Sequence, residues 1–180
     1  MTTLVLTVIG DDRAGLVKAL ADVVSSHGGN WERSHLAELA GQFAGIVVVT
    51  VPDTAEAALR ADLRPLEGLL DVVVHQGSAD DAGPASSPAE AAHRRASISV
   101  LGNDHPGIVQ AVSGALAANG LSVVGLESLV RDAPMAGGRL FEAHAVVSVP
   151  GDADLDAVTR DLEELAGEVQ VEIALEPDPA

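Results

Sequence analysis

Two short polar turns carry the residue types that could bind a small charged molecule. The first reads GDDRAGLV, from Gly10 to Val17, and the second reads GNDHPGIV, from Gly102 to Val109. In each turn a glycine lets the chain bend sharply, and an aspartate, Asp12 or Asp104, follows it. The free amide N–H groups and the positive dipole end of the helix that follows can bind a carboxylate. A nearby aspartate can meet an ammonium group, so each turn suits a zwitterion such as a free amino acid.

The same turns also have a plainer structural interpretation. Tight strand-to-helix connections favour glycine at Gly10 and Gly15 even without a ligand. The favoured interpretation of Asp12 and Asp104 is that each caps the helix that follows, a contact that stabilises a helix by about 1 kcal/mol. His105 is either a pH sensor in such a pocket or an ordinary exposed loop histidine.

No other reactive constellation is indicated. The chain has no cysteine, which excludes thiolate metal sites, cysteine nucleophiles and disulfides. Its six histidines lack the spacing on one helix that zinc ligands need. No G-x-S-x-G nucleophile elbow occurs and no Ser/His/Asp set is placed by the pattern. We therefore expect no metal site, no cofactor and no enzymatic activity. Trp31, the single tryptophan, is expected to be a partly buried strand residue rather than a stacking platform.

The elements that position the two turns are themselves repeated. The segment from Val8 to Asn30 aligns without a gap on Val100 to Ser122, and Phe43 to Pro52 aligns on Phe141 to Pro150. A loop that contains DAPMAG accounts for the longer second copy. The chain therefore consists of two units rather than a solenoid.

Each unit reads as strand, helix, two strands, helix and strand. In the first, the β-branched run TLVLTVI predicts a strand, and Leu16, Leu20 and Val24 share one face of a helix that ends at a glycine pair. A strand over about 30–39, a turn at 40–41 and the strand GIVVVTV follow. The order predicts an α+β fold: two ferredoxin-like βαββαβ domains in tandem. Each would have a four-stranded antiparallel sheet with both helices on one face. The apolar strand IVVVTV predicts that an uncovered face or an edge is buried against the sister unit or another chain.

Three helix boundaries are predicted from single residues. Pro106 suits the first helical position, where its missing N–H has no partner to lose. DTAE, from Asp53 to Glu56, has the spacing of a capping box. Pro65 should end or kink the helix that this box opens.

Composition shifts give the domain limits. The segment SADDAGPASSPAEAA is rich in Ala, Ser, Pro and Asp and has no apolar periodicity, which is typical of a flexible tether. We expect a first domain at 1–77, a linker at 78–93, a second domain at 94–176 and a tail at 177–180.

The net charge of the chain indicates which classes of macromolecule it can bind. The formal charge is −17, with 10 Lys and Arg against 27 Asp and Glu. Such a surface repels nucleic acid and anionic membranes, so any effect on gene expression should pass through another protein. The N-terminal segment has no signal-peptide pattern and no apolar run long enough to cross a bilayer, so we expect a cytoplasmic protein.

The G-x-D-x-x-G-[LI]-V turn within a βαββαβ unit resembles that of the ACT domain, a regulatory module that binds amino acids. Two such units without a catalytic domain resemble the glycine cleavage system transcriptional repressor family. The resemblance covers both units but not the linker or the tail. The chain departs from the family pattern at Ala14, where proline is usual, at His105, where arginine is usual, and at Ser122, where asparagine often stands.

The resemblance implies a small amino acid as ligand, glycine or serine favoured, and a homodimer. Carried over by position, the ligand-binding residues would come from both turns and from the start of each second strand. They are Gly10, Asp11, Asp12, Arg13, Ala14, Gly15, Leu16 and Asn30 in the first unit, and Gly102, Asn103, Asp104, His105, Pro106, Gly107, Ile108 and Ser122 in the second.

The function predicted from sequence is therefore that of a non-enzymatic, amino-acid-sensing regulator. It would repress glycine cleavage genes through a transcription-factor partner. Two alternatives stay open: a ligand-independent protein-interaction adaptor, and an orphan regulatory subunit of an amino-acid metabolic enzyme.

Overall fold

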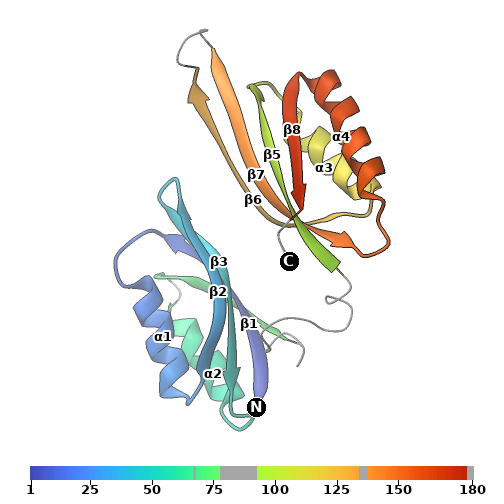
Figure 1. Ribbon diagram of the computed structural model, residues 1–180. Coiled ribbons are helices and arrows are strands. Elements are labelled where there is room, and N and C mark those ends of the chain that lie inside the picture. Colours follow the sequence, from blue (N-terminus) through green and yellow to red (C-terminus); the bar gives the residue numbers. More distant parts are fainter. Residues whose placement is uncertain (67, 78–92, 134–137, 178–180) are drawn as a thin grey trace. The chain divides into compact units, whose positions relative to one another are not determined.

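The computed structural model describes residues 1–66, 68–77, 93–133 and 138–177. The chain divides into two compact units, Met1–Ser87 and Pro88–Ala180, and each is described by itself (Figure 1). Apart from residues at their edges, the expected linker at 78–93, the expected tail at 177–180 and the DAPMAG loop lie outside the described residues. The expected domain limits therefore stay predictions.

Both units have the predicted order of elements. The first unit consists of β1 (Thr2–Asp11), α1 (Leu16–Ser26), β2 (Asn30–Leu39), β3 (Gln42–Val51), α2 (Glu56–Leu63), a 3-10 turn (Arg64–Leu66) and β4 (Asp71–Gln76). The second consists of β5 (His93–Asn103), α3 (Ile108–Ala118), β6 (Ser122–Asp132), β7 (Arg139–Pro150), α4 (Leu155–Val169) and β8 (Val171–Pro177).

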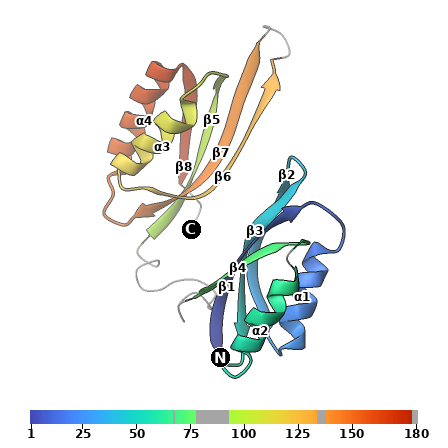
Figure 2. The same cartoon turned by 180° about the vertical axis from the view of Figure 1, so that it is seen from behind.

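Each unit contains one antiparallel sheet. The strand orders are β2-β3-β1-β4 and β6-β7-β5-β8, so the first strand of each unit lies inside its sheet and the second lies at an edge. Both helices of a unit cover the same face of its sheet (Figure 2). The α+β, ferredoxin-like fold predicted for each unit is confirmed. The predicted turn at Ala40 and Gly41 has φ values of 54° and 79°, which suits a two-residue hairpin.

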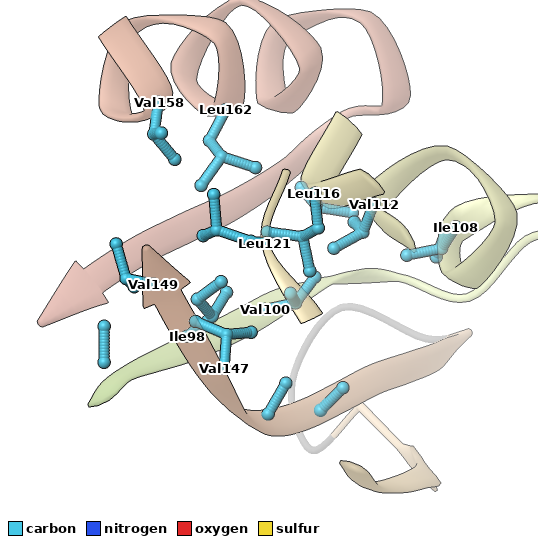
Figure 3. Packing of buried hydrophobic residues seen from close by; sticks show 14 of the residues in the cluster. Ile98, Val100, Ile108, Val112, Leu116, Leu121, Val147, Val149, Val158 and Leu162 are labelled. Atoms are coloured by element: carbon cyan, nitrogen blue, oxygen red, sulfur yellow. The ribbon is translucent and has the colours of Figure 1, made fainter. Parts of the chain in front are cut away.

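The core of each unit lies between its helices and its sheet. In the first, the predicted helix face of Leu16, Leu20 and Val24 is buried against alternate residues of β1 and β3. In the second, Ile108, Val112 and Leu116 of α3 and Val158 and Leu162 of α4 point at the strands (Figure 3). Trp31 is partly buried and packs against the first core, as predicted for a strand residue.

The other face of the first sheet carries no helix and keeps apolar side chains in solvent. Ile9 on β1, Ile46 on β3 and Val73 on β4 are about half exposed. The expectation that such a face is buried against another unit or chain stays a prediction.

Of the two boundaries predicted for helix α2, one differs in the structure and the other is confirmed. Helix α2 starts at Glu56, and its N-cap, Ala55, has no side-chain cap. Asp53 instead accepts hydrogen bonds from the Thr2 hydroxyl and the N-terminal amino group. The predicted capping box is therefore wrong, because the N-terminus competes for this carboxylate. The helix ends at Leu63 and continues as the 3-10 turn, which confirms that it stops before Pro65.

Candidate functional site at the strand-to-helix corners

Gly10 and Gly102 allow the last strand of each unit to begin close beside the first. A Cβ at Gly10 would lie 2.6 Å from the carbonyl oxygen of Leu69, and a Cβ at Gly102 would lie 2.6 Å from Val171 Cγ1 and 2.8 Å from its Cα. Contacts this short with backbone cannot be relieved by rotating a side chain. The requirement for glycine at these two positions is therefore structural.

Gly15 and Gly107 are required for a different reason. They are the N-cap residues of α1 and α3, with φ values of 98° and 99°. That left-handed conformation is open to glycine at little cost. A Cβ at either position would meet no heavy atom within 4 Å, so the space beside each N-cap is open. The amide N–H groups of the first helical turn have no intrahelical acceptor.

The favoured interpretation of Asp12 and Asp104 as helix caps is wrong. Neither α1 nor α3 has a side-chain cap hydrogen bond. The backbone N–H of Asp12 donates to Gly41 O at 2.9 Å, and that of Asp104 to Arg139 O at 2.8 Å, which prolongs the sheet ladder by one bond. The helices start four residues later, at Leu16 and Ile108, so neither aspartate stands at the N-cap position, which Gly15 and Gly107 occupy.

Pro106 also lies outside its predicted position. The helix begins at Ile108 after the N-cap Gly107, so Pro106 precedes the cap. The side chains of Ile108 and its counterpart Leu16 are 2% exposed and belong to the cores. These two residues can therefore offer a ligand only their backbone N–H groups. Ala14 and Asn103 are exposed.

Arg13 and His105 hold equivalent places and make equivalent contacts. An Nη of Arg13 donates to Gly68 O at 2.7 Å, and His105 Nε2 lies 2.7 Å from Val169 O. In both units this residue ties the corner to the backbone before the last strand. His105 Nδ1 also lies 3.0 Å from Pro106 O.

The state of His105 follows from its two partners. Both are carbonyl oxygens, which only accept, so only the imidazolium form can donate to both at once. The bond to Val169 O and then the bond to Pro106 O raise the pKa of His105 above its ordinary value, with Asp104 adding a smaller electrostatic contribution. The residue that makes this contact is therefore always positively charged in the first unit, where it is Arg13, but it can lose its proton in the second, where it is His105.

A cavity of about 290 Å³ with a mixed polar and apolar lining, the apolar part from Ile9, Leu69 and Leu70, lies at the first corner. Asp11, Arg13 and Asp71 bring both signs of charge to its wall, together with Gly10, Gln42 and Gly68. Gln42 Nε2 donates to Asp11 Oδ1 at 2.9 Å. Sequence reasoning did not select Gln42, Gly68 or Asp71. Gln42 had a usable signal, since it begins β3 directly opposite Asp11 in register.

Asn30 and Ser122 do not lie at the corners of their own units. Asn30 pairs with Thr50, which pairs with Thr3, at the start of β1. Seven residue-to-residue steps of extended strand lead from Thr3 to Gly10, a distance of about 23 Å. Ser122 likewise pairs with Ser148, opposite the beginning of β5 rather than its end. Within one unit, neither side chain can share a small ligand with the corner.

No group of three or more His, Cys, Asp or Glu side chains is placed to hold a metal ion in the part of the chain that the structure describes. No helix among those residues is long and apolar enough to span a bilayer.

Comparisons with known proteins agree with this architecture. Family models described as ACT domain match residues 2–76 and residues 96–167. An unknown protein from Galdieria sulphuraria has 29% sequence identity and a TM-score of 0.86, covering 99% of this chain and 99% of that chain. A protein assigned provisionally as a glycine cleavage system transcriptional repressor has 16% identity and a TM-score of 0.72, covering 99% of this chain and 98% of the other. At that identity, the second likeness shows a shared fold. No protein in the curated set has a significant sequence match.

Proposed function

The chain belongs to the ACT-domain family, with two such domains in tandem, and on that premise we propose that it is a non-enzymatic regulator that binds a small amino acid. Glycine or serine is the favoured ligand. The observation that carries the proposal is the cavity at the first corner, whose lining includes charges of both signs, from Asp11, Arg13 and Asp71.

The groups at the first corner match a zwitterion. Asp11 and Asp71 offer carboxylates to an ammonium group, and Arg13 offers a guanidinium to a carboxylate. The amide N–H groups after Gly15 offer the carboxylate a second place to bind. The cavity of about 290 Å³ accommodates a small amino acid. Because a bidentate guanidinium–carboxylate pair is strong and directional, Arg13 is the residue on which we expect affinity to depend most.

The second corner repeats this arrangement with other side chains. The first unit has the sequence DDRA before its N-cap Gly15, and the second has Asn103, Asp104, His105 and Pro106 before its N-cap Gly107. The space beside Gly107 is open, as it is beside Gly15. An ion pair of 3.7 Å joins Asp104 Oδ2 to Arg139. A carboxylate and a cation thus stand beside this corner as well, and we propose that it binds the same class of ligand with its own affinity.

Calorimetry with a panel of amino acids tests the proposal. Sensors of metabolites need only weak binding, and we expect dissociation constants from about 10 µM to 1 mM, or about 4–7 kcal/mol. Arg13→Ala should weaken binding at least tenfold. The control is Arg160→Ala, which removes an exposed arginine within α4 that belongs to neither corner sequence. An absence of heat and of thermal shift with every amino acid would rule out sensing.

We further propose that the regulator acts through a protein partner, such as a transcription factor of glycine cleavage genes. Ligand binding can alter a signal only if it favours one arrangement of the protein over another. A homodimer is the arrangement that we propose for it. Pull-down from native extract, with and without glycine, identifies the partner and separates a transcription factor from a metabolic enzyme.

One observation favours the adaptor as a second candidate. Half-exposed Ile9, Ile46 and Val73 share the face of the first sheet that carries no helix, and apolar patches of this kind mark contact surfaces. An adaptor would keep its partner in Arg13→Ala and would bind it equally with and without amino acid.

A further inference from the structure

The cavity at the first corner is shared with the segment that leads into strand β4. One part of its wall comes from the corner and the start of β3, and the other part comes from residues 68–71. Strand β4 lies at an edge of the sheet, with β1 as its single neighbour (Figure 2). It has six residues, whereas β2 at the opposite edge has ten. Few backbone hydrogen bonds therefore keep β4 in the sheet, and local opening is easiest where such bonds are few.

Arg13 already joins the two parts of the cavity wall. Its guanidinium donates to Gly68 O at 2.7 Å, and the missing side chain of Gly10 lets the backbone at Leu69 and Leu70 pack directly on the corner. A guanidinium has five N–H donors, so a bond to one carbonyl leaves donors for a carboxylate. A ligand carboxylate can therefore bind Arg13 while the bond from Arg13 to Gly68 O persists.

Asp71, the first residue of β4, lines the same cavity. It pairs with Ile9, so its side chain lies on the face of the sheet that also carries Ile9 and Asp11. Asp11 Oδ1 already accepts a hydrogen bond from Gln42. The Asp71 carboxylate makes no hydrogen bond or ion pair with any residue that the structure describes. Asp71 therefore has both carboxylate oxygens available to an ammonium group.

Given the proposed function, on which this inference rests, we propose that the bound amino acid bridges Arg13 and Asp71 and thereby fixes strand β4 against β1. The ligand's carboxylate binds the guanidinium of Arg13, and its ammonium group binds the carboxylate of Asp71. Because both residues line one cavity, a single small molecule can contact both. A ligand that makes this bridge only while β4 is paired with β1 lowers the population of the opened strand. Opening of β4 is thus the local equilibrium that occupancy of the corner controls.

Hydrogen exchange followed by NMR on the full chain tests the proposal, with glycine and serine as the probes. The N–H of Gly77 donates to Thr3 O. Because hydrogen-bonded pairs alternate along an antiparallel ladder, the N–H groups of Val73 and His75 also bond to β1. With a probe at about 100 times its dissociation constant, exchange of these two amides should slow at least tenfold, toward the limit of about 100-fold for a ligand that binds only the paired strand. The amides of β2 that bond to β3 should slow much less.

Two variants of the cavity wall test the role of Asp71. Asp71→Asn removes the bridging charge, so we expect at least tenfold weaker binding and, at saturation, no selective slowing of exchange in β4. Asp11→Asn is the matched variant, because it removes the same charge from the same cavity and keeps an oxygen for Gln42. It should also weaken binding, but at saturation it should keep the selective slowing at Val73 and His75.

The outcomes separate this bridge from amino-acid binding itself. The bridge is overturned if a probe binds but β2 and β4 slow equally, or if exchange in β4 becomes faster. It is also overturned if the selective slowing persists in Asp71→Asn or disappears in Asp11→Asn. In each of these cases binding at the corner remains. An absence of binding in calorimetry would instead remove the proposed function and the bridge together.

Discussion

Gly15 and Gly107 occupy backbone conformations that decide the residue type without any side-chain contact. Their φ values are 98° and 99°, and the space beside each is open. Other residues lose about 1–2 kcal/mol in the left-handed region. We expect Gly15→Ala and Gly107→Ala each to lower the free energy of unfolding by that amount, measured in urea.

Gly114→Ala is the matched control for this prediction. Gly114 lies inside α3, has no positive φ and would place its Cβ in open space. The same substitution there should raise the free energy of unfolding by about 1 kcal/mol, because alanine favours the helix over glycine. A loss of stability at Gly114, or none at Gly15 and Gly107, would contradict this account of the corners.

His105 makes the stability of the second unit depend on pH. Its pKa is raised in the folded protein by the carbonyl oxygens of Val169 and Pro106. The imidazolium therefore stabilises the fold fully below the ordinary histidine pKa, about 6.5, and this contribution is lost as pH rises through the higher folded pKa. Thermal unfolding followed from pH 5.5 to pH 9 should show this loss.

Two variants at position 105 test the cause of that dependence. His105→Arg should remove the decline, because arginine stays charged throughout the range, as Arg13 does in the first unit. His105→Gln should be uniformly less stable than wild type at low pH and equal to it at high pH. If His105→Arg keeps the full decline, another group is responsible.

The corner residues show how far local sequence patterns extend. The glycines, the acidic turn and the following helix were all predictable, because steric limits on φ act within a few residues. The absence of a capping role for Asp12 and Asp104 was not predictable, because the sheet ladder continues through their N–H groups and delays the start of the helix. The hydrogen bonds of Arg13 and His105 could not be predicted from sequence either, because the carbonyl groups that they contact lie 55 and 64 residues away in the chain.

At the scale of the elements, helix α4 has the side-chain cap that α2 lacks. Asp154 Oδ1 accepts from the N–H groups of Asp156 and Ala157 at 3.1 and 3.2 Å. Asp154→Ala should therefore lower the free energy of unfolding by about 1 kcal/mol. Asp53→Ala, at the position where sequence alone predicted a cap, should change it little, because this exposed carboxylate only meets the N-terminus and Thr2. Equal losses from both, in the same denaturant titration, would contradict the assignment.

The order of the elements was predictable in both units because the same sequence pattern occurs twice in the chain. Each apolar pattern that was ambiguous in one copy was supported by its counterpart, as the two helix faces of Leu16 and Ile108 illustrate. The positions of the strand ends relative to the corners were predicted less well. A strand–helix–strand segment returns the chain to the level at which its first strand began, so Asn30 had to lie near Thr3 rather than near Gly10. The order of the elements therefore implied the position of Asn30, but the family resemblance grouped Asn30 with the residues of the corner.

At the scale of the whole molecule, the charge of −17 predicts no direct binding to DNA. Affinity for a duplex depends on Lys and Arg that neutralise phosphates and release counterions. Here 27 acidic residues outnumber 10 basic ones. In the described residues, several arginines, including Arg60, Arg131 and Arg139, already pair with carboxylates. Fluorescence anisotropy with a labelled random duplex should show no binding, even at about 20 mM salt, where screening is weak.

The same measurement separates two routes of gene regulation. If the chain acts through a partner, its addition should change the binding of that partner to DNA while the chain alone stays inert. Amino acid should alter this effect in the wild type and much less in Arg13→Ala. Binding of the chain alone that weakens steeply with salt would instead reveal a basic surface hidden by the net charge. Since net charge governs association at long range rather than the chemistry of one site, that result would overturn the partner-mediated route and leave the two corners as ligand sites.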